Sequence, residues 1–293
     1  MKEIETKTIL STTKDQQWFG NDYNMNLFRG CCHGCIYCDS RSDCYGIENF
    51  DCVRAKKNAL FILNNELKRR RKKGVIGIGA MSDSYNPWEH ELELTRGALQ
   101  LIHHYGFGIS LETKSPLVVR DIDLFQSIQQ KNNVIIKLTI TCSKDALSKK
   151  IEPHVAPSSE RFKAIKRLSE AGIFCGVLMT PILPFITDSD ENMMEVIRMS
   201  YEAGAKFVFS MYGVTLRDNQ REYYYTQLDR LFPGLSFQYR QHYRNAYFCS
   251  MNDFHRKKRL FEQTCQHFGL LYRMEDIIQA YKKSEAIKQL SLF

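Results

Sequence analysis

The amino-acid sequence lacks the long apolar run that a membrane-spanning helix requires. Its longest apolar stretches, such as Ile173–Met179, are interrupted by Cys175 and Gly176. They stay well short of the roughly 18 consecutive apolar residues needed to cross a bilayer. The opening residues MKEIETKTIL also lack a basic segment followed by an apolar one, the pattern of a secretory signal. We therefore expect a soluble, cytoplasmic protein with no membrane partner.

The chain also lacks internal repeats and low-complexity tracts. Its 293 residues, of which 43% are hydrophobic, suffice for one catalytic domain with an appendage. The formal charge of +8 favours a polyanionic partner. Two basic runs, at residues 68–73 and 255–259, carry much of this charge, although solvated helix ends are the simpler explanation for both.

Short β-rich runs alternate with helical segments between Tyr23 and Met211. This order predicts parallel strands that are joined by right-handed crossover helices. We therefore expect an α/β fold, with a partial (β/α)6 barrel of the TIM type in residues 1–215. The six predicted strands are Tyr23–Arg29, Val75–Met81, Phe107–Glu112, Val134–Ile140, Ile173–Thr180 and Phe207–Met211.

After Tyr212 the pattern changes to helical segments rich in aromatic and basic residues, at 221–232, 252–268 and 274–289. We expect residues 216–293 to form a C-terminal helical extension. In a barrel of parallel strands the chemistry lies at the C-terminal ends of the strands, where the following loops converge. The loop after the first predicted strand is therefore expected in the active site.

That loop contains three closely spaced cysteines, Cys31, Cys35 and Cys38, in a C-x3-C-x2-C pattern. Gly30 and Gly34 allow a short loop to wrap so that the three thiolates converge. A 4Fe-4S cluster normally takes four Cys ligands, so three leave one iron open to another molecule. In a reducing compartment such clustering favours metal ligation over disulfides.

Zinc is the structural alternative for this loop. His33 would then have to serve as the fourth ligand, because a closed structural zinc site has four. Zinc ligands usually come as two separated Cys or His pairs, and this loop lacks that arrangement. The spacing therefore favours the iron-sulfur cluster.

Several segments resemble the radical S-adenosylmethionine (SAM) superfamily, and within it the subgroup related to spore photoproduct lyase. The resemblance covers about residues 20–215 in order and spacing. Besides the cysteine loop, it is carried by Gly79–Asp83, Glu112–Ser115, Ile151–Pro153 and the stretch from Arg161 to Pro184. It implies a 4Fe-4S cluster and SAM as cofactors. It also implies a reductant such as flavodoxin or ferredoxin.

The resemblance further implies residue roles. Tyr37 would lie beside the adenine of SAM, and Ser82, Lys114 and Thr139 would make further contacts with SAM. A Lys point charge suits a carboxylate, and hydroxyl groups suit a ribose or an amino group. By resemblance, one electron from the reduced cluster cleaves SAM to methionine and a 5′-deoxyadenosyl radical, which abstracts hydrogen from the substrate.

Two positions depart from spore photoproduct lyase. Ala80 stands where the lyase has its hydrogen-donating cysteine, and Asp39 stands where it has a relay tyrosine. Direct repair of the spore photoproduct is therefore not expected. Cys142 and Cys175 are alternative candidates for a hydrogen donor, although both also fit as buried core residues.

The last residues resemble the short peptide with which bacterial repair proteins dock on the DNA sliding clamp. Leu290, Leu292 and Phe293 would fill apolar pockets, and Gln289 would form a hydrogen bond at the edge. Packing of the tail on its own domain is the alternative. Clamp binding would make DNA the expected substrate, with the tyrosine-rich extension as a stacking surface and the damaged base flipped out.

Two other functions fit the same residues. One is a radical SAM enzyme that acts on a free nucleoside, nucleotide or RNA base. The other is a non-enzymatic iron-sulfur or zinc module that senses redox state through its cysteines. A sensor has no need for a six-strand barrel with matched SAM-contact positions, so catalysis is the better prediction.

Overall fold

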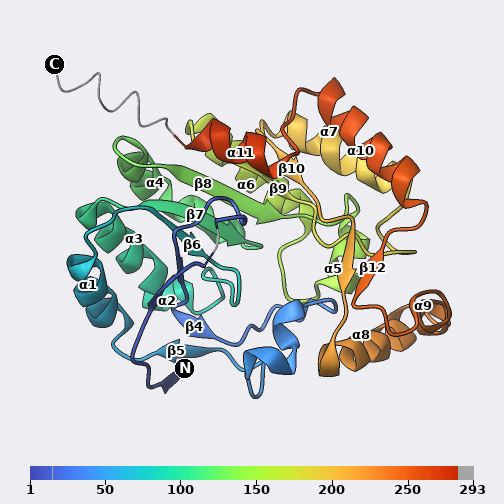
Figure 1. Cartoon of the computed structure of the whole chain (residues 1–293), viewed down its shortest axis with the longest axis horizontal. Coiled ribbons are helices and arrows are strands. Elements are labelled where there is room, and N and C mark those ends of the chain that lie inside the picture. Colours follow the sequence, from blue (N-terminus) through green and yellow to red (C-terminus); the bar gives the residue numbers. More distant parts are fainter. Residues whose placement is uncertain (15, 283–293) are drawn as a thin grey trace.

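The computed structural model describes residues 1–14 and 16–282. Within these residues seven strands form the main sheet, in the order β10-β9-β8-β7-β6-β3-β2, and every neighbouring pair except β2 and β3 is parallel (Figure 1). The sheet is open, so the predicted partial barrel of six parallel strands is confirmed. The strands are β2 (Leu10–Thr12), β3 (Tyr23–Met25), β6 (Val75–Ile78), β7 (Gly108–Thr113), β8 (Val134–Thr139), β9 (Cys175–Leu178) and β10 (Val208–Phe209).

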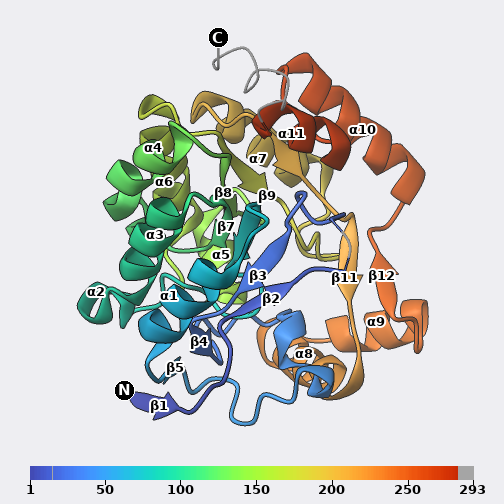
Figure 2. The same ribbon diagram turned by 60° about the vertical axis from the view of Figure 1, so that its left-hand side comes forward.

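The central strands are almost completely buried. Every residue of β6, β8 and β9 is buried, which explains their continuous Val, Ile and Leu content. Helices cover the outer face of the sheet (Figure 2). They are α1 (Ala59–Arg69), α3 (Leu94–Tyr105), α4 (Ile122–Gln129), α6 (Ser158–Glu170) and α7 (Asp190–Glu202). The short helix α2 (Glu89–Leu92) precedes α3, and α5 (Asp145–Ile151) packs against the cysteine loop.

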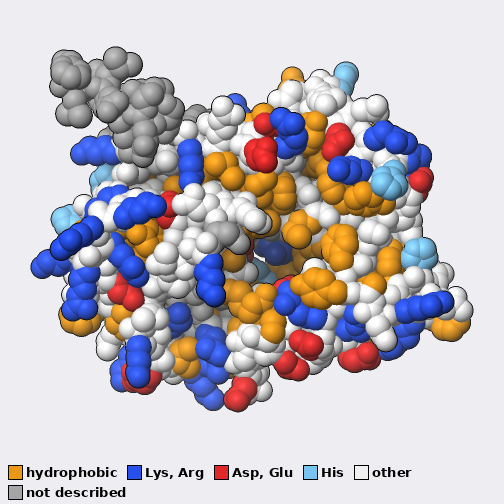
Figure 3. Space-filling model, viewed as in Figure 1, with side chains coloured by type: hydrophobic (Ala, Val, Ile, Leu, Met, Phe, Trp, Pro, Cys, Tyr) orange, Lys and Arg blue, Asp and Glu red, His pale blue; other side chains and the backbone are white. Residues whose placement is uncertain are grey.

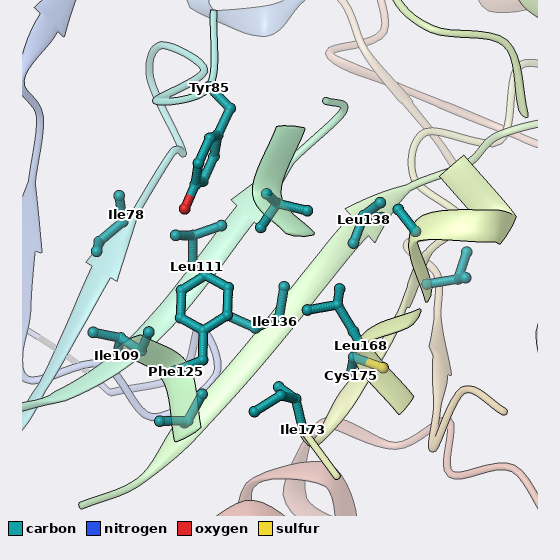
Figure 4. Close-up of a cluster of buried hydrophobic side chains, with 14 of the residues drawn as sticks. Ile78, Tyr85, Ile109, Leu111, Phe125, Ile136, Leu138, Leu168, Ile173 and Cys175 are labelled. Atoms are coloured by element: carbon teal, nitrogen blue, oxygen red, sulfur yellow. The ribbon is translucent and has the colours of Figure 1, made fainter. Parts of the chain in front are cut away.

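The hydrophobic core lies between the sheet and these helices. Figure 4 shows Leu111 and Ile136 on adjacent strands beneath Phe125 of α4 and Leu168 of α6. All four side chains are fully buried. Burial of each such side chain stabilises the fold by about 1.5–3 kcal/mol. On the opposite face, some strand residues pack in a second buried cluster and others line a cavity.

The first predicted strand, Tyr23–Arg29, was wrong in its length. The chain leaves the main sheet after β3, and Leu27 then accepts a backbone hydrogen bond from Lys56 at 3.0 Å. Phe28–Arg29 forms β4 in a separate small sheet of order β1-β5-β4, with β1 (Lys2–Ile4) and β5 (Arg54–Lys56). The cysteine loop therefore starts from this small sheet rather than directly from the barrel.

Segments from the two ends of the described chain meet beneath the main sheet. Phe19 packs in one buried cluster with Phe207 and with Ile277 of α11 (Met274–Tyr281). The Tyr281 hydroxyl and the Lys282 ammonium donate hydrogen bonds to the backbone carbonyls of residues 19 and 20. This contact closes the N-terminal ends of the strands.

The predicted helical extension contains strands as well as helices. β11 (Gly213–Thr215) and β12 (Phe248–Ser250) pair antiparallel across the predicted boundary at residue 215. The helices of this region are α8 (Asp218–Leu231), α9 (Leu235–Tyr243), α10 (Phe254–His267) and α11. The division at residue 215 stays a prediction. The clamp-like residues Gln289, Leu290, Leu292 and Phe293 lie outside the described residues.

The helices of the described chain are short. The longest of them, α8 and α10, have 14 residues each. None of the helices in residues 1–14 and 16–282 is long and apolar enough to cross a membrane.

Candidate active site

A cavity of about 770 Å³ opens at the C-terminal ends of the strands. In Figure 3 this face of the molecule is hollowed near its centre, and hydrophobic side chains surround the hollow. Nearly all the predicted site residues line this cavity. Its lining includes Cys31, Cys35, Cys38, Tyr37, Asp39, Ala80, Ser82, Lys114 and Thr139.

The cysteine loop owes its path to glycine. Gly30 has φ +82°, and a Cβ there would lie 2.6 Å from the carbonyl oxygen of Cys52, so a side chain would clash with backbone. The amide of Cys31 donates to the carbonyl of Phe50 at 2.8 Å, which fixes the start of the loop. Gly34 also has positive φ, at +67°. These two positions bring the three thiols to one cavity wall.

The charges around the three thiols differ. Burial acts to raise the pKa of the Cys31 thiol, but hydrogen bonding to His33 and its charge outweigh burial and lower that pKa. Burial raises the pKa of both Cys35 and Cys38, and the Lys114 ammonium works in the opposite direction at each. Lys114 therefore favours thiolates in this wall.

In residues 1–14 and 16–282, no group of three His, Cys, Asp or Glu residues is arranged to hold a single metal ion. Cluster ligands bind different iron atoms, so a 4Fe-4S cube does not require such a group. His33, the proposed fourth zinc ligand, is buried 3.6 Å from the carboxylate of Asp83.

A buried network fixes Tyr37. Its hydroxyl donates a short hydrogen bond to Glu152, and Glu152 forms a short ion pair with Arg161. Arg161 is fully buried and donates to the carbonyl of Thr139 at 2.7 Å. Burial opposes ionisation of Glu152, but Arg161 and Lys114 lower its pKa overall. The network therefore links the cysteine loop, the end of β8 and helix α6 through groups that are all charged or hydrogen bonded.

The backbone holds the same loop in place. The amide of Ile36 donates to the carbonyl of Ile151 at 3.0 Å, and the amide of His154 donates to the carbonyl of His33 at 3.2 Å. The segment between α5 and α6 therefore clamps both sides of Cys35.

Asp83 organises the part of the wall that adjoins the cysteine loop. It accepts hydrogen bonds from the hydroxyl of Thr113 at 2.6 Å and from the amide of Lys114 at 2.7 Å. Ser82, the preceding residue, donates to the carbonyl of Gly30. Burial opposes the charge of Lys114, yet the negative groups of Cys35 and Glu152 raise its pKa above the ordinary value. Lys114 is therefore a charged ammonium at the cavity wall.

Asp39 has structural partners at the cavity mouth. It accepts hydrogen bonds from Arg217 at 2.8 and 3.0 Å, from Thr215 at 3.0 Å and from Tyr45 at 2.9 Å. It therefore ties the cysteine loop to β11 and the segment that follows. Ala80 also lines the cavity, and its methyl group offers no thiol.

The sequence profile of the radical SAM superfamily matches residues 25–197, more than half of the chain. The chain belongs to this superfamily. An uncharacterized protein of Mycobacterium tuberculosis is 28% identical over 251 residues, which cover 83% of this chain and 74% of that relative. An uncharacterized protein of Methanocaldococcus jannaschii is 33% identical over 189 residues, 64% of this chain and 69% of the relative.

The fold is also similar to a solved radical SAM structure. Spore photoproduct lyase complexed with dinucleoside spore photoproduct superposes with a TM-score of 0.68, at 14% identity, and covers 92% of this chain and 79% of the lyase chain. The likeness establishes the fold. Membership of the superfamily makes this protein a radical SAM enzyme and implies a 4Fe-4S cluster, SAM and a reductant.

The two cysteines considered as hydrogen donors for radical SAM chemistry do not lie in the cavity wall. Cys175 begins β9, at the end of the strand away from the active site, and its thiol contacts the carbonyl of Ile165 at 3.6 Å. Cys142 is fully buried beyond the end of β8, with its thiol 3.8 Å from the carbonyl of Lys144. Neither cysteine is among the residues that line the cavity, and the identity of the hydrogen donor stays a prediction.

The sequence reasoning missed a polar group deeper in the same cavity. Trp18, Asn21, Asn24 and Glu112 line it together with the predicted SAM contacts. Trp18 donates its indole N–H to Glu112 at 3.2 Å, and the buried Lys137 lies 3.6 Å from the same carboxylate. A buried Lys within a predicted strand was the available signal, since Lys is almost never fully buried without a partner.

Lys137 makes a testable contribution to the pH dependence of stability. Burial lowers its pKa from 10.5 to about 8, although Glu112 partly compensates. Between these values the unfolded chain binds more protons, so the free energy of unfolding rises with pH, by about 3 kcal/mol in total. We expect Lys137→Met to remove this rise, as measured by urea unfolding between pH 7.5 and 10.

The exposed Lys166 on α6 provides the matched control. Lys166→Met should keep the pH dependence of the parent protein. Identical pH slopes for Lys137→Met and the parent would contradict the assignment.

Proposed function

We propose that the enzyme binds a 4Fe-4S cluster through Cys31, Cys35 and Cys38 and cleaves SAM reductively to abstract hydrogen from a nucleobase-containing substrate, DNA being the favoured form. The observation that supports it is the convergence of the three thiols, Tyr37 and Lys114 on one cavity. When bound, the cluster supplies one electron to the sulfonium of SAM. The protein supplies orientation and shields the site from water.

The cavity wall fits these cofactors. Three cysteines leave one iron for the amino and carboxylate groups of SAM, and the charged Lys114 suits that carboxylate. The Tyr37 ring, whose centroid lies 5.9 Å from the Lys114 ammonium, is fixed by the hydrogen bond of its hydroxyl to Glu152 and suits the adenine. Thr139 offers a hydroxyl, and Ser82 supports the loop through Gly30.

The rim of the cavity supports a nucleic-acid substrate. Tyr247 and Phe248 line the cavity and are 53% and 37% exposed, which is high for large aromatic side chains. Arg217 lies between the rings of Tyr45 and Tyr247, at 5.6 and 5.1 Å from their centroids. Aromatic and Arg side chains in this arrangement stack on bases with little sequence preference. A base would have to leave its stack to pass this rim.

Ala80 and Asp39 argue against repair of the spore photoproduct itself. Ala80 has no thiol and so cannot donate a thiol hydrogen. Asp39 already accepts hydrogen bonds from Arg217 and Thr215. We therefore propose a lyase-like reaction on a different nucleobase. A free nucleoside, nucleotide or RNA base is the alternative substrate, and the deuterium experiment below separates these substrates.

The electron donor is proposed to be an acidic flavodoxin or ferredoxin. A concavity of about 570 Å³ lies on the outer side of the cysteine loop, lined by Cys32, Gly34, His154 and Arg230, among others. Lys149 and Lys150 are exposed at the adjacent end of α5. These basic groups would steer an acidic partner to the side of the cluster away from the substrate.

Two further proposals accompany this function. The enzyme would act in the cytoplasm, where such a reductant is available.

The segment Gln289–Phe293 would dock on a DNA sliding clamp, and a pull-down with the isolated tail peptide would measure binding of the clamp. Retention of the clamp by a peptide that lacks Leu292 and Phe293 would contradict clamp docking.

The proposed reaction is tested by anaerobic reconstitution with iron and sulfide, followed by SAM and dithionite. We expect 5′-deoxyadenosine and methionine in equal amounts. A level of 5′-deoxyadenosine no higher than in the protein-free sample would contradict radical SAM cleavage.

The substrate class is tested by transfer of deuterium into 5′-deoxyadenosine from deuterated DNA oligonucleotides, nucleosides and RNA. Transfer from nucleosides or RNA alone would contradict DNA as the substrate.

Lys114→Met should weaken SAM binding by about tenfold or more, because a charge-assisted hydrogen bond contributes about 1.5–3 kcal/mol. The long apolar side chain keeps the volume of Lys114, so the cavity wall is retained. Equilibrium dialysis against labelled SAM measures the effect. Lys144→Met, at an exposed position after β8, is the control and should bind SAM like the parent. Equal affinity in Lys114→Met would contradict its role.

A further inference from the structure

The deep end of the cavity carries hydrogen-bond acceptors with no assigned role. Asn21 is only 3% exposed, and its side-chain oxygen has no hydrogen-bond partner among the described residues. Buried polar atoms are almost always paired, so an unpaired one that lines a cavity indicates a missing ligand group. Asn21 lines the same cavity as the cysteines.

Glu112 adds a second acceptor beside Asn21. Both contacts that hold this carboxylate, from the Trp18 indole at 3.2 Å and from Lys137 at 3.6 Å, fall on Oε2. Oε1 is thereby left to face a ligand. Lys137 lies behind the carboxylate, where it donates to Ser110 at 2.8 Å, and it neutralises the charge without occupying the cavity. The site therefore offers acceptors in a nearly neutral pocket.

Trp18 supplies a flat apolar wall next to these acceptors. Its ring packs edge-on against Phe19 and Phe209, with centroids 5.1 and 5.7 Å apart, so its orientation is fixed. A rigid aromatic face together with hydrogen-bond acceptors suits a planar heterocycle that bears N–H groups.

The depth of the group separates it from the predicted SAM contacts. Glu112 lies within β7, whereas Lys114 follows the end of that strand at Thr113, so Glu112 starts further from the C-terminal edge of the sheet. Gly77, opposite Ser110, has no side chain and leaves room for Asn21 and Asn24, since a Cβ there would lie 2.3 and 2.7 Å from their side-chain atoms.

We propose that Trp18, Asn21 and Glu112 recognise the substrate base, through the N–H donors on its hydrogen-bonding edge. This inference rests on the proposed function and names the group of the substrate that enters the cavity. Acceptors select bases that carry amino or ring N–H groups. A base that lacks those groups leaves Asn21 and Glu112 unpaired and therefore binds more weakly.

Trp18 itself reports whether the site is occupied, because the chain has only one other tryptophan, Trp88. In a reconstituted Trp88→Phe enzyme all tryptophan fluorescence comes from Trp18. We expect 2′-deoxyguanosine to quench it and 2′-deoxynebularine, a purine without amino or ring N–H groups, to bind at least tenfold more weakly. Absence of quenching by 2′-deoxyguanosine, or equal binding of the two nucleosides, would overturn the inference.

Two variants in the Trp88→Phe background test whether the selective binding of 2′-deoxyguanosine depends on Glu112 and Asn21. Glu112→Gln and Asn21→Ser should each weaken binding of 2′-deoxyguanosine by about tenfold. The Asn21 variant keeps the Glu112–Lys137 pair, so it remains informative if Glu112→Gln fails to fold. Glu191→Gln, a surface position on α7, is the matched control and should bind like the parent.

SAM binding, measured by dialysis on the same variants, distinguishes substrate from cofactor. We expect both variants to lose more affinity for 2′-deoxyguanosine than for SAM. An equal or greater loss of SAM affinity would assign Asn21 and Glu112 to SAM and overturn the inference. Formation of 5′-deoxyadenosine by the Trp88→Phe parent in the same preparation shows separately whether the proposed function holds.

Discussion

Replacement of Cys35 by Ala should reduce formation of 5′-deoxyadenosine to the level of a protein-free sample. Cys35 is buried at the centre of the loop, between the two backbone hydrogen bonds made by Ile36 and His33. With two thiolates left, the loop has too few ligands to retain a 4Fe-4S cluster. Iron content and the visible absorbance of the reconstituted protein should fall together with activity.

Cys52 provides the matched control for this loss. It is exposed and close to the loop, and its backbone rather than its thiol packs against Gly30. Cys52→Ala should keep both iron and activity. Retention of the cluster by Cys35→Ala, with far-ultraviolet circular dichroism unchanged, would contradict the assignment of the ligands.

Replacement of Arg161 by Met should destabilise the enzyme by about 3–5 kcal/mol, because it leaves Glu152 as an uncompensated buried charge. Both side chains have no exposed surface. Arg161 also donates to the carbonyls of Ala156 and Thr139 at 2.8 and 2.7 Å, and these acceptors would lose their partner. Urea unfolding followed by circular dichroism measures the change.

The exposed Arg167 on the same helix is the comparison for Arg161. Arg167→Met should change the free energy of unfolding by less than about 0.5 kcal/mol. The double variant Arg161→Met, Glu152→Leu removes both charges and should recover much of the lost stability. Similar stability of the Arg161 and Arg167 variants would show that the buried pair does not hold the loop.

Most of the barrel could be predicted because its strands are buried on both faces. A strand such as β8 reads as a continuous apolar run broken only by Lys137, and the helices between strands have their own apolar period. The segment Tyr23–Arg29 was predicted poorly, because the partner of β4 lies in Arg54–Lys56. Pairing between distant segments leaves no local pattern.

In the candidate site, too, features that depend on local sequence could be predicted, whereas contacts between distant segments could not. The spacing of Cys31, Cys35 and Cys38 is local and was readable, and their convergence follows from it. The hydrogen bond between Tyr37 and Glu152 joins residues 115 positions apart, so spacing could not reveal it. Trp18 and Asn21 precede the first barrel strand and look like ordinary loop residues until the fold brings them under the cavity.

The closure beneath the sheet affects the order in which the enzyme can mature. The backbone carbonyls of Phe19 and Gly20 are synthesised before their hydrogen-bond donors, Tyr281 and Lys282, which lie 262 positions later in the chain. Folding that proceeds during synthesis would therefore leave the N-terminal ends of the barrel strands uncovered until Tyr281 and Lys282 have been made. Asn21 follows directly in the chain, so the proposed base-binding end of the cavity would take its final form only after the cysteine loop has been made.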